Sequence, residues 1–172
     1  MAWMPRRVVT GHDEQGKSVF LHDGEPPVAS TAPDGAGFFE IWSTSGAPAP
    51  ITAAEPDPAA DGAIFVPPPA RGTKIRFNSF PPGTVSPVHR TQSVDYGIVI
   101  EGEVVLVLDD AETVLRAGDI AIQRGTSHRW ENRADSVARM VFVLVDAQFS
   151  EELLAALDDE VLGSLLHDPL AG

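Results

Sequence analysis

The middle of the chain alternates apolar and polar residues with a period of two, the pattern of β-strands that bury one face. Seven runs between residues 73 and 146 carry it: TKIRFNSF, SVDYGIVIE, EVVLVLD, ETVLRA, DIAIQ, SHRWEN and VARMVFVLV. Turn residues such as Pro81-Pro82-Gly83 and Asp109-Asp110 separate the runs. Many short strands at even spacing, without helices between them, favour an antiparallel sandwich or barrel. We therefore expect an all-β barrel domain over residues 73–149.

The first 72 residues predict extra strands and a long loop that pack on this barrel. Residues 6–21 indicate a β-hairpin, and Phe38 to Thr44 (FFEIWST) indicates another strand. Residues 45–69 are rich in Pro, Ala, Gly and Asp, and proline has no N–H to donate within a sheet. We interpret this segment as a surface loop or insertion along the barrel, with a lid as the alternative.

The last segment, residues 150–172, changes to a helical period and predicts one short C-terminal helix. Ser150 is a suitable N-cap, and apolar residues then recur every four positions at Leu153, Leu157, Val161 and Leu165. A helix that closes one end of the barrel is the favoured interpretation. A helix exchanged between two protomers is the alternative. The three segments together form one structural domain.

Composition excludes several classes of partner and site. The 172 residues carry a formal net charge of −13, which disfavours nucleic acid and anionic membranes as partners. The absence of cysteine excludes disulfides, thiol catalysis and thiolate metal sites. The N-terminus shows no secretory signal, and the longest apolar stretch, Met140 to Val145, is too short to cross a bilayer. We expect a cytoplasmic protein.

Two of the five histidines, His89 and His128, open predicted strands. Alternate residues of a barrel strand point inward, so the two imidazoles are able to meet in one cavity. His12, His22 and His167 lie in polar or turn-rich sequence, and we expect them on the surface.

The sequence around both histidines resembles the tandem motifs of the cupin superfamily. The first motif, G-x5-H-x-H-x3,4-E-x6-G, is matched in frame by Gly83, His89, Thr91, Asp95 and Gly102. The second, roughly G-x5-P-x-G-x2-H-x3-N, is matched by Gly118, Gly125, His128 and Asn132, with one residue missing and Gln123 where proline is usual. The resemblance covers residues 73–146 and implies a jelly-roll barrel of the small microbial type.

The resemblance also implies a metal site, which this sequence alters. Members of the family usually hold the metal with three histidines and a glutamate, whereas here Thr91 replaces one histidine and Asp95 the glutamate. His89, Asp95 and His128 remain as catalytic residues and as ligands for a divalent metal (Fe, Zn, Mn, Co or Ni). The alternative is a decayed site in which Asp95 orients a histidine. Thr91 and Trp130 share strand parity with the histidines and are candidate substrate-binding residues.

Three functions follow from this candidate site. The first is a metal-dependent enzyme, an oxygenase, lyase or isomerase, that acts on a small organic molecule. The second is a metal-free enzyme in which a histidine and Asp95 act as acid and base. The third is a module that only binds a small ligand. A homodimer is expected in each case, because a jelly roll of this size exposes sheet edges.

Overall fold

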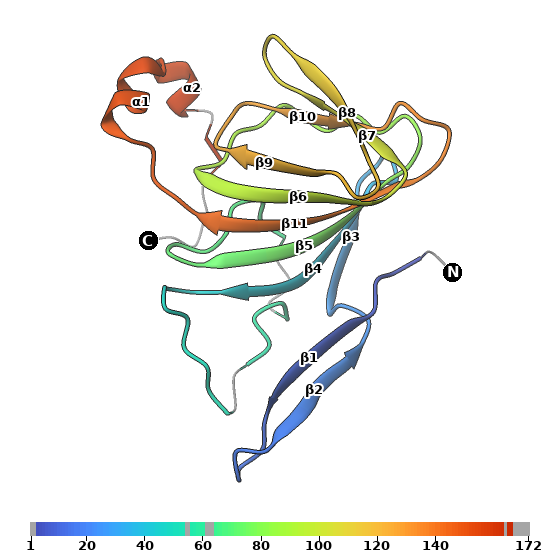
Figure 1. The fold of residues 1–172 in the computed structure, drawn as a ribbon, viewed down its shortest axis with the longest axis vertical. Helices are drawn as coiled ribbons and strands as arrows, with labels where there is room; N and C mark the ends of the chain where they lie inside the picture. Colours follow the sequence, from blue (N-terminus) through green and yellow to red (C-terminus); the bar gives the residue numbers. More distant parts are fainter. Residues whose placement is uncertain (1–2, 54–55, 61–63, 164, 167–172) are drawn as a thin grey trace.

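The strands form two facing antiparallel sheets, as the computed structural model shows for residues 3–53, 56–60, 64–163 and 165–166 (Figure 1). The larger sheet has the order β3-β4-β5-β11-β6-β9, and the smaller has the order β10-β7-β8. The bounds are β3 Val28–Thr31, β4 Gly37–Thr44, β5 Thr73–Phe80, β6 Ser93–Glu101, β7 Glu103–Val107, β8 Glu112–Arg116, β9 Ile120–Arg124, β10 Arg129–Glu131 and β11 Ala138–Asp146. The expected antiparallel jelly-roll fold is confirmed.

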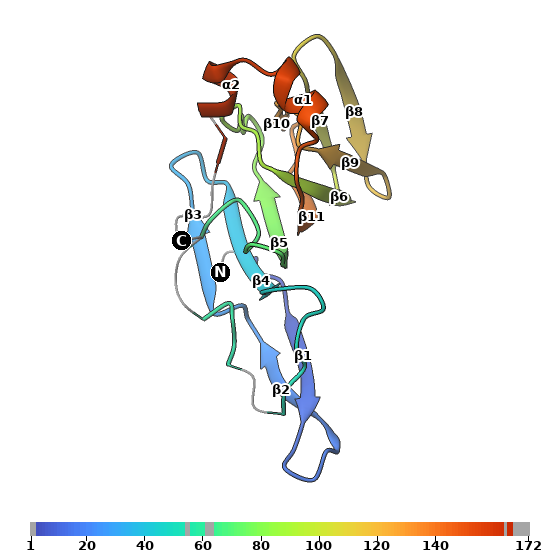
Figure 2. The same ribbon diagram turned by 90° about the vertical axis from the view of Figure 1, so that its left-hand side faces the viewer.

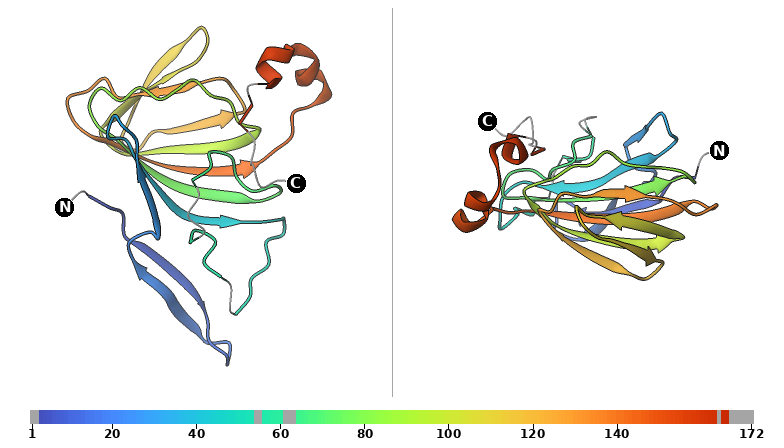
Figure 3. Two further views of the ribbon diagram at one scale, coloured as in Figure 1. Left: turned by 180° about the vertical axis from the view of Figure 1, so that it is seen from behind. Right: turned by 90° about the horizontal axis from the view of Figure 1, so that it is seen from above.

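The two sheets face each other (Figure 3), and the hydrophobic core lies between them. Strand β11 lies in the middle of the larger sheet and pairs with β5 on one side and β6 on the other. Its even-numbered residues point inward, so Ala138 and Met140 are completely buried. Val99 of β6 and Val104 of β7 pack in the same core cluster. The period-two pattern therefore fixes which side chains enter the barrel.

The N-terminal hairpin is confirmed as β1 Arg7–His12 and β2 Ser18–Gly24, and it projects from the barrel (Figures 1 and 2). Ahead of it, Trp3 lies against Phe77, with ring centroids 4.9 Å apart, and covers the outer face of the larger sheet. The sequence did not indicate β3, a four-residue edge strand, because its residues VAST carry almost no hydrophobic pattern.

The described part of residues 45–72 contains neither helix nor strand, as its composition predicts. It packs along the barrel through polar contacts. Arg7 Nη1 donates to Asp57 Oδ1 at 2.9 Å, which ties the loop to the hairpin. The carbonyl oxygen of Phe65 accepts from Lys74 Nζ at 2.6 Å and also from Arg76 of β5.

The prediction of a single C-terminal helix is wrong, because two short helices form in its place. Ser150 does cap a helix, accepting from Leu153 N at 3.2 Å, but α1 ends after six residues, Glu151–Ala156. Leu157 is extended, and the Asp158 carboxylate accepts from Val161 N at 2.8 Å to start α2, Asp159–Gly163. Neither helix buries a residue, so no packing opposes the break. His167 lies outside the described residues.

After α2 the chain returns to the barrel, where Leu166 N donates to Arg90 O at 3.0 Å. Neither of the two helices in the described part of the chain is long and apolar enough to cross a membrane.

Candidate active site

His89 and His128 lie side by side at one end of the barrel. Each backbone N–H donates to the carbonyl oxygen of the other at 3.0 Å, which joins the segment before β6 to the segment before β10. The two imidazole centroids are 4.3 Å apart. The structure therefore brings together the two histidines that the sequence singles out.

Backbone carbonyls fix which nitrogen of each imidazole is available. His89 Nδ1 is 3.0 Å from Pro87 O, and His128 Nδ1 is 2.9 Å from Thr126 O. A carbonyl oxygen only accepts, so each Nδ1 carries the proton and each Nε2 keeps a free lone pair. Burial, and secondarily the nearby charge of His89, lower the pKa of His128 to about 4. The His128 side chain is thus neutral at physiological pH, and its Nε2 lone pair is available to a ligand.

Asp95 enters the barrel interior from β6. Burial raises its pKa to about 6, against the opposing effect of the Ser93 and Thr91 hydroxyls. Its Oδ1 is buried and has no hydrogen-bond partner in the described part of the chain. Thr91 is 2% exposed, and its hydroxyl accepts from Ser93 Oγ at 2.8 Å. Thr91 therefore lies beside Asp95, as expected, but it is not among the residues that line the cavity.

A cavity of about 350 Å³ opens in front of His89, Asp95 and His128. The remaining residues that line it are Phe38, Val66, Arg76, Asn78, Phe80, Ser86, Pro87, Val88, Gln123, Trp130, Phe142, Leu144 and Leu166. Trp130 is edge-on to His128, with ring centroids 5.9 Å apart, and to Phe142, at 5.3 Å. Most of the wall is apolar, which is typical of sites for small organic ligands.

Four polar lining residues were missed as site residues by the sequence analysis: Arg76, Asn78, Ser86 and Gln123. Arg76 and Asn78 alternate with apolar residues in the run TKIRFNSF, so they resemble the solvent face of a strand. In the structure this polar face points inward. Arg76 Nε donates to Glu40 Oε1 at 2.9 Å, and both side chains are nearly inaccessible to solvent. The one available signal was Gln123, which occupies the motif position where proline is usual.

His89, His128 and Asp95 are residue types that bind divalent metals, but their side chains are not arranged around a common metal position. Two neutral imidazole nitrogens and a buried carboxylate oxygen without a partner are ordinary ligands for Zn, Fe, Mn, Co or Ni. In the chain as described, however, no three His, Asp or Glu side chains lie close enough to hold an ion together.

Other residues of the tandem motifs shape the backbone around the site. Gly125, before His128, has φ +62°, and a Cβ there would lie 2.4 Å from the Phe149 ring, so only glycine fits. Asn132, at the end of the second motif, donates to Phe80 O at 2.7 Å and to Ser136 O at 2.8 Å. It thereby joins the end of β5 to the turn before β11.

Comparisons with known proteins agree with this architecture. A family model described as a cupin domain matches residues 77–144. Phomopsin biosynthesis cluster protein C' of Diaporthe leptostromiformis is 35% identical over 167 residues, which cover 94% of this chain and 86% of that protein. The cupin-domain-containing oxidoreductase fogC of Aspergillus ruber is 37% identical over 148 residues, 81% of this chain and 71% of that protein.

Among solved structures, a Cupin 2 conserved barrel domain protein from Salinispora arenicola has a TM-score of 0.46 and 19% identity, over 72% of this chain and 87% of that one. The family assignment rests on the relatives and the family model, which agree with the jelly-roll barrel. The chain belongs to the cupin family.

Proposed function

We propose that the protein is an enzyme that acts on a small organic molecule in the cavity beside His89 and His128. The observation that carries this proposal is the pair of imidazoles with free Nε2 atoms, which line an apolar cavity together with Asp95, whose buried Oδ1 has no partner. The names of the relatives, which include oxidoreductases and biosynthesis cluster proteins, favour oxidoreductase chemistry in a biosynthetic route.

In this proposal His89 and His128, together with Asp95, hold a divalent metal. The ion would act as a Lewis acid, with open positions for substrate and, if it is iron, for dioxygen. The chain itself supplies the neutral imidazoles, whose orientation is set by Pro87 O and Thr126 O. The apolar walls, Trp130 among them, exclude water from the bound substrate.

We expect His89→Ala and His128→Ala each to reduce the bound metal at least about tenfold, because each removes one of the two imidazole ligands. Elemental analysis of protein without a histidine tag, grown with Fe, Zn, Mn, Co or Ni, measures this. His22→Ala on β2 is the matched control and should keep the wild-type content, since His22 contacts Asp57 instead. Wild-type protein without metal under all five conditions would contradict the metal site.

A metal-free acid–base enzyme is the second candidate, favoured by one observation. Burial brings the pKa of Asp95 to about 6, near the value that suits a general base at neutral pH. No hydrogen bond joins Asp95 to either histidine in the described structure, so Asp95 itself, rather than a histidine that it orients, would take the proton. Activity that survives a chelator but not Asp95→Asn would distinguish this candidate.

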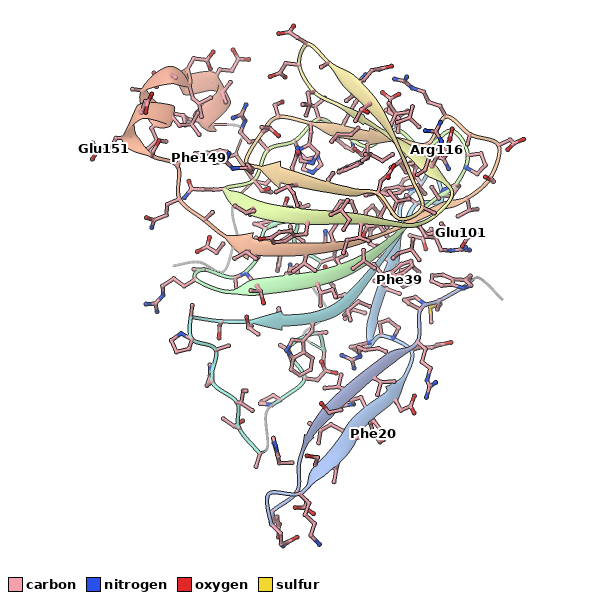
Figure 4. All side chains as sticks on the ribbon, viewed as in Figure 1. Phe20, Phe39, Glu101, Arg116, Phe149 and Glu151 are labelled. Atoms are coloured by element: carbon pink, nitrogen blue, oxygen red, sulfur yellow. The ribbon has the colours of Figure 1, made fainter. Side chains whose placement is uncertain are left out.

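We further propose that the protein is a homodimer. An isolated two-stranded hairpin is at best marginally stable in water, yet β2 is almost entirely exposed and Phe20 is 73% exposed (Figure 4). The outer face of β6 and β9 also exposes apolar side chains, of which Tyr96 and Ile122 are opposite each other in the register. A second copy is able to cover both surfaces, because each copy carries both.

Phe20→Lys and Ile122→Lys are each expected to shift this dimer towards monomer, because each places a charge in the apolar contact. Light scattering coupled to size-exclusion chromatography at micromolar concentration measures the mass. Ile51→Lys, at a loop residue that is 84% exposed, is the control and should leave the mass unchanged. Wild-type protein that elutes as a monomer would refute the proposal.

A further inference from the structure

Two buried amide side chains line the cavity without hydrogen-bond partners. Asn78 is 8% exposed and Gln123 is 5% exposed. Asn78 Oδ1 and Gln123 Nε2 are each inaccessible to solvent and unpartnered in the described part of the chain. A buried polar atom that makes no hydrogen bond destabilises the folded state, so its position beside a cavity points to a ligand that completes it.

The two amides lie on separate strands of the larger sheet and at different levels along it, because Asn78 is opposite Met140 of β11, whereas Gln123 is opposite Asp95, which pairs with Leu144. Asn78 is on β5 and Gln123 on β9, and the sheet order β5-β11-β6-β9 places two strands between them. Adjacent strands are about 4.8 Å apart, so the amides enter the cavity from well-separated strands. Between them, β11 contributes only Phe142 and Leu144 to the lining. The cavity therefore has two polar ends and an apolar middle.

The end near Gln123 is the histidine end. Gln123 is directly opposite Asp95 in the pairing of β6 with β9, so the two side chains lie on the same face of the sheet. An unpartnered donor, Gln123 Nε2, and an unpartnered acceptor, Asp95 Oδ1, thus lie on neighbouring strands. A hydroxyl group is able to satisfy both, because it donates and accepts.

The end of the cavity near Asn78 has almost no net charge. Its cation, Arg76, forms a buried ion pair with Glu40, which is opposite it in the register of β4 and β5. Asn78 itself is neutral. Its unpartnered atom, Oδ1, is an acceptor, so a hydroxyl group, which donates, fits this end, whereas a carbonyl, carboxylate or phosphate oxygen has no proton to donate to it.

We propose that Asn78 is a specificity-determining residue whose Oδ1 accepts a hydrogen bond from a hydroxyl group of the substrate at the end of the cavity away from the histidines. The substrate is then a molecule with an apolar body and a hydroxyl group at each end, one held by Asn78 and the other by Gln123 and Asp95. This inference rests on the proposed function, since it takes the histidine end as the reacting end.

Vanillyl alcohol, with hydroxyl groups at opposite ends of one ring, is the probe, and guaiacol is the same ring without the hydroxymethyl group. In calorimetric titrations with chelator, we expect Asn78→Leu to weaken the binding of vanillyl alcohol about 5- to 20-fold, the effect of one lost hydrogen bond. Guaiacol should bind both proteins within about twofold, because it has no hydroxyl group at that end to donate to Asn78. Vanillin, whose aldehyde accepts but does not donate, should bind wild-type protein more weakly than vanillyl alcohol.

A thermal readout separates a ligand-binding amide from a structural one. Asn78→Leu is expected to raise the Tm of the ligand-free protein by about 2–4 °C, because it removes an unpaired buried amide. Asn132→Leu, the same substitution at a buried amide that donates to Phe80 O and Ser136 O, should lower it.

The inference is overturned if wild-type protein does not bind vanillyl alcohol, if Asn78→Leu binds it unchanged, if vanillin binds more tightly, or if Asn78→Leu lowers the Tm. None of these titrations requires a metal. A protein that binds metal but not vanillyl alcohol would thus refute the substrate class alone, and one that binds vanillyl alcohol without ever holding metal would refute only the metal site.

Discussion

Replacing Glu40 with glutamine is expected to lower the free energy of unfolding by about 3–5 kcal/mol, the usual cost of leaving one charge of a buried ion pair uncompensated. Arg76 donates to Glu40 through both Nε and Nη2, and the two side chains are 6% and 7% exposed. The neutral amide keeps the shape of Glu40 but not its charge. The guanidinium would then remain in the interior with only neutral acceptors, the amide oxygen at position 40 and the Phe65 carbonyl.

Urea denaturation monitored by circular dichroism measures this loss, and two further variants show whether the charge causes it. Glu112→Gln removes the same charge from an exposed pair with Arg133, whose side chains are 51% and 47% exposed, and should cost only a small fraction of that loss. The double variant Glu40→Leu/Arg76→Met should recover most of the stability, because it removes both charges. Equal losses for Glu40→Gln and Glu112→Gln would show that the pair is not buried in solution.

The period-two pattern predicted most of the fold because strand pairing depends on local alternation. The run SVDYGIVIE coincides with β6, Ser93–Glu101, and the N-terminal hairpin formed where its turn residues indicated. The pattern failed where local signals were weak or in conflict. Strand β3 has only four residues, and Asp158 starts a second helix within a leucine repeat that looks continuous.

The spacing of the histidines located the site, but the far wall of the cavity was not predictable from local sequence. In β5 the apolar residues Ile75 and Phe77 alternate with polar ones, which suggests that Arg76 and Asn78 face solvent. Instead both faces of the strand are covered. Trp3, distant in sequence, packs on Phe77 at the outer face, so the polar face turns into the barrel. This contact between residues far apart in the sequence determines which face of β5 points inward, and a local sequence pattern cannot predict it.

His128 and Asp95 are expected to give opposite pH dependences of stability that nearly cancel in the wild-type protein. Asp95 has a pKa raised from its ordinary 3.8 to about 6, so its contribution is present below pH 3.8 and is lost as pH rises through 6. His128 has a pKa lowered from 6.5 to about 4, so its contribution is present above pH 6.5 and is lost as pH falls towards 4. Each difference corresponds to about 3 kcal/mol.

Single substitutions should therefore expose each dependence. Between pH 7 and pH 4, Asp95→Asn is expected to lose about 3 kcal/mol more unfolding free energy than wild type, because only the cost of protonating His128 remains. His128→Gln is expected to gain about 3 kcal/mol relative to wild type over the same range, because only Asp95 remains. Urea denaturation with chelator at several pH values measures both.

The double variant Asp95→Asn/His128→Gln should again run parallel to wild type, because the other titrating groups are common to all four proteins. That parallel curve separates the effect of this pair from general acid denaturation. If both single variants also ran parallel to wild type, the burial of Asp95 and His128 would not be perturbing their titration. Opposite slopes would instead show that, between pH 4 and pH 6, folding moves the proton from His128 to Asp95 and leaves both groups uncharged in the interior.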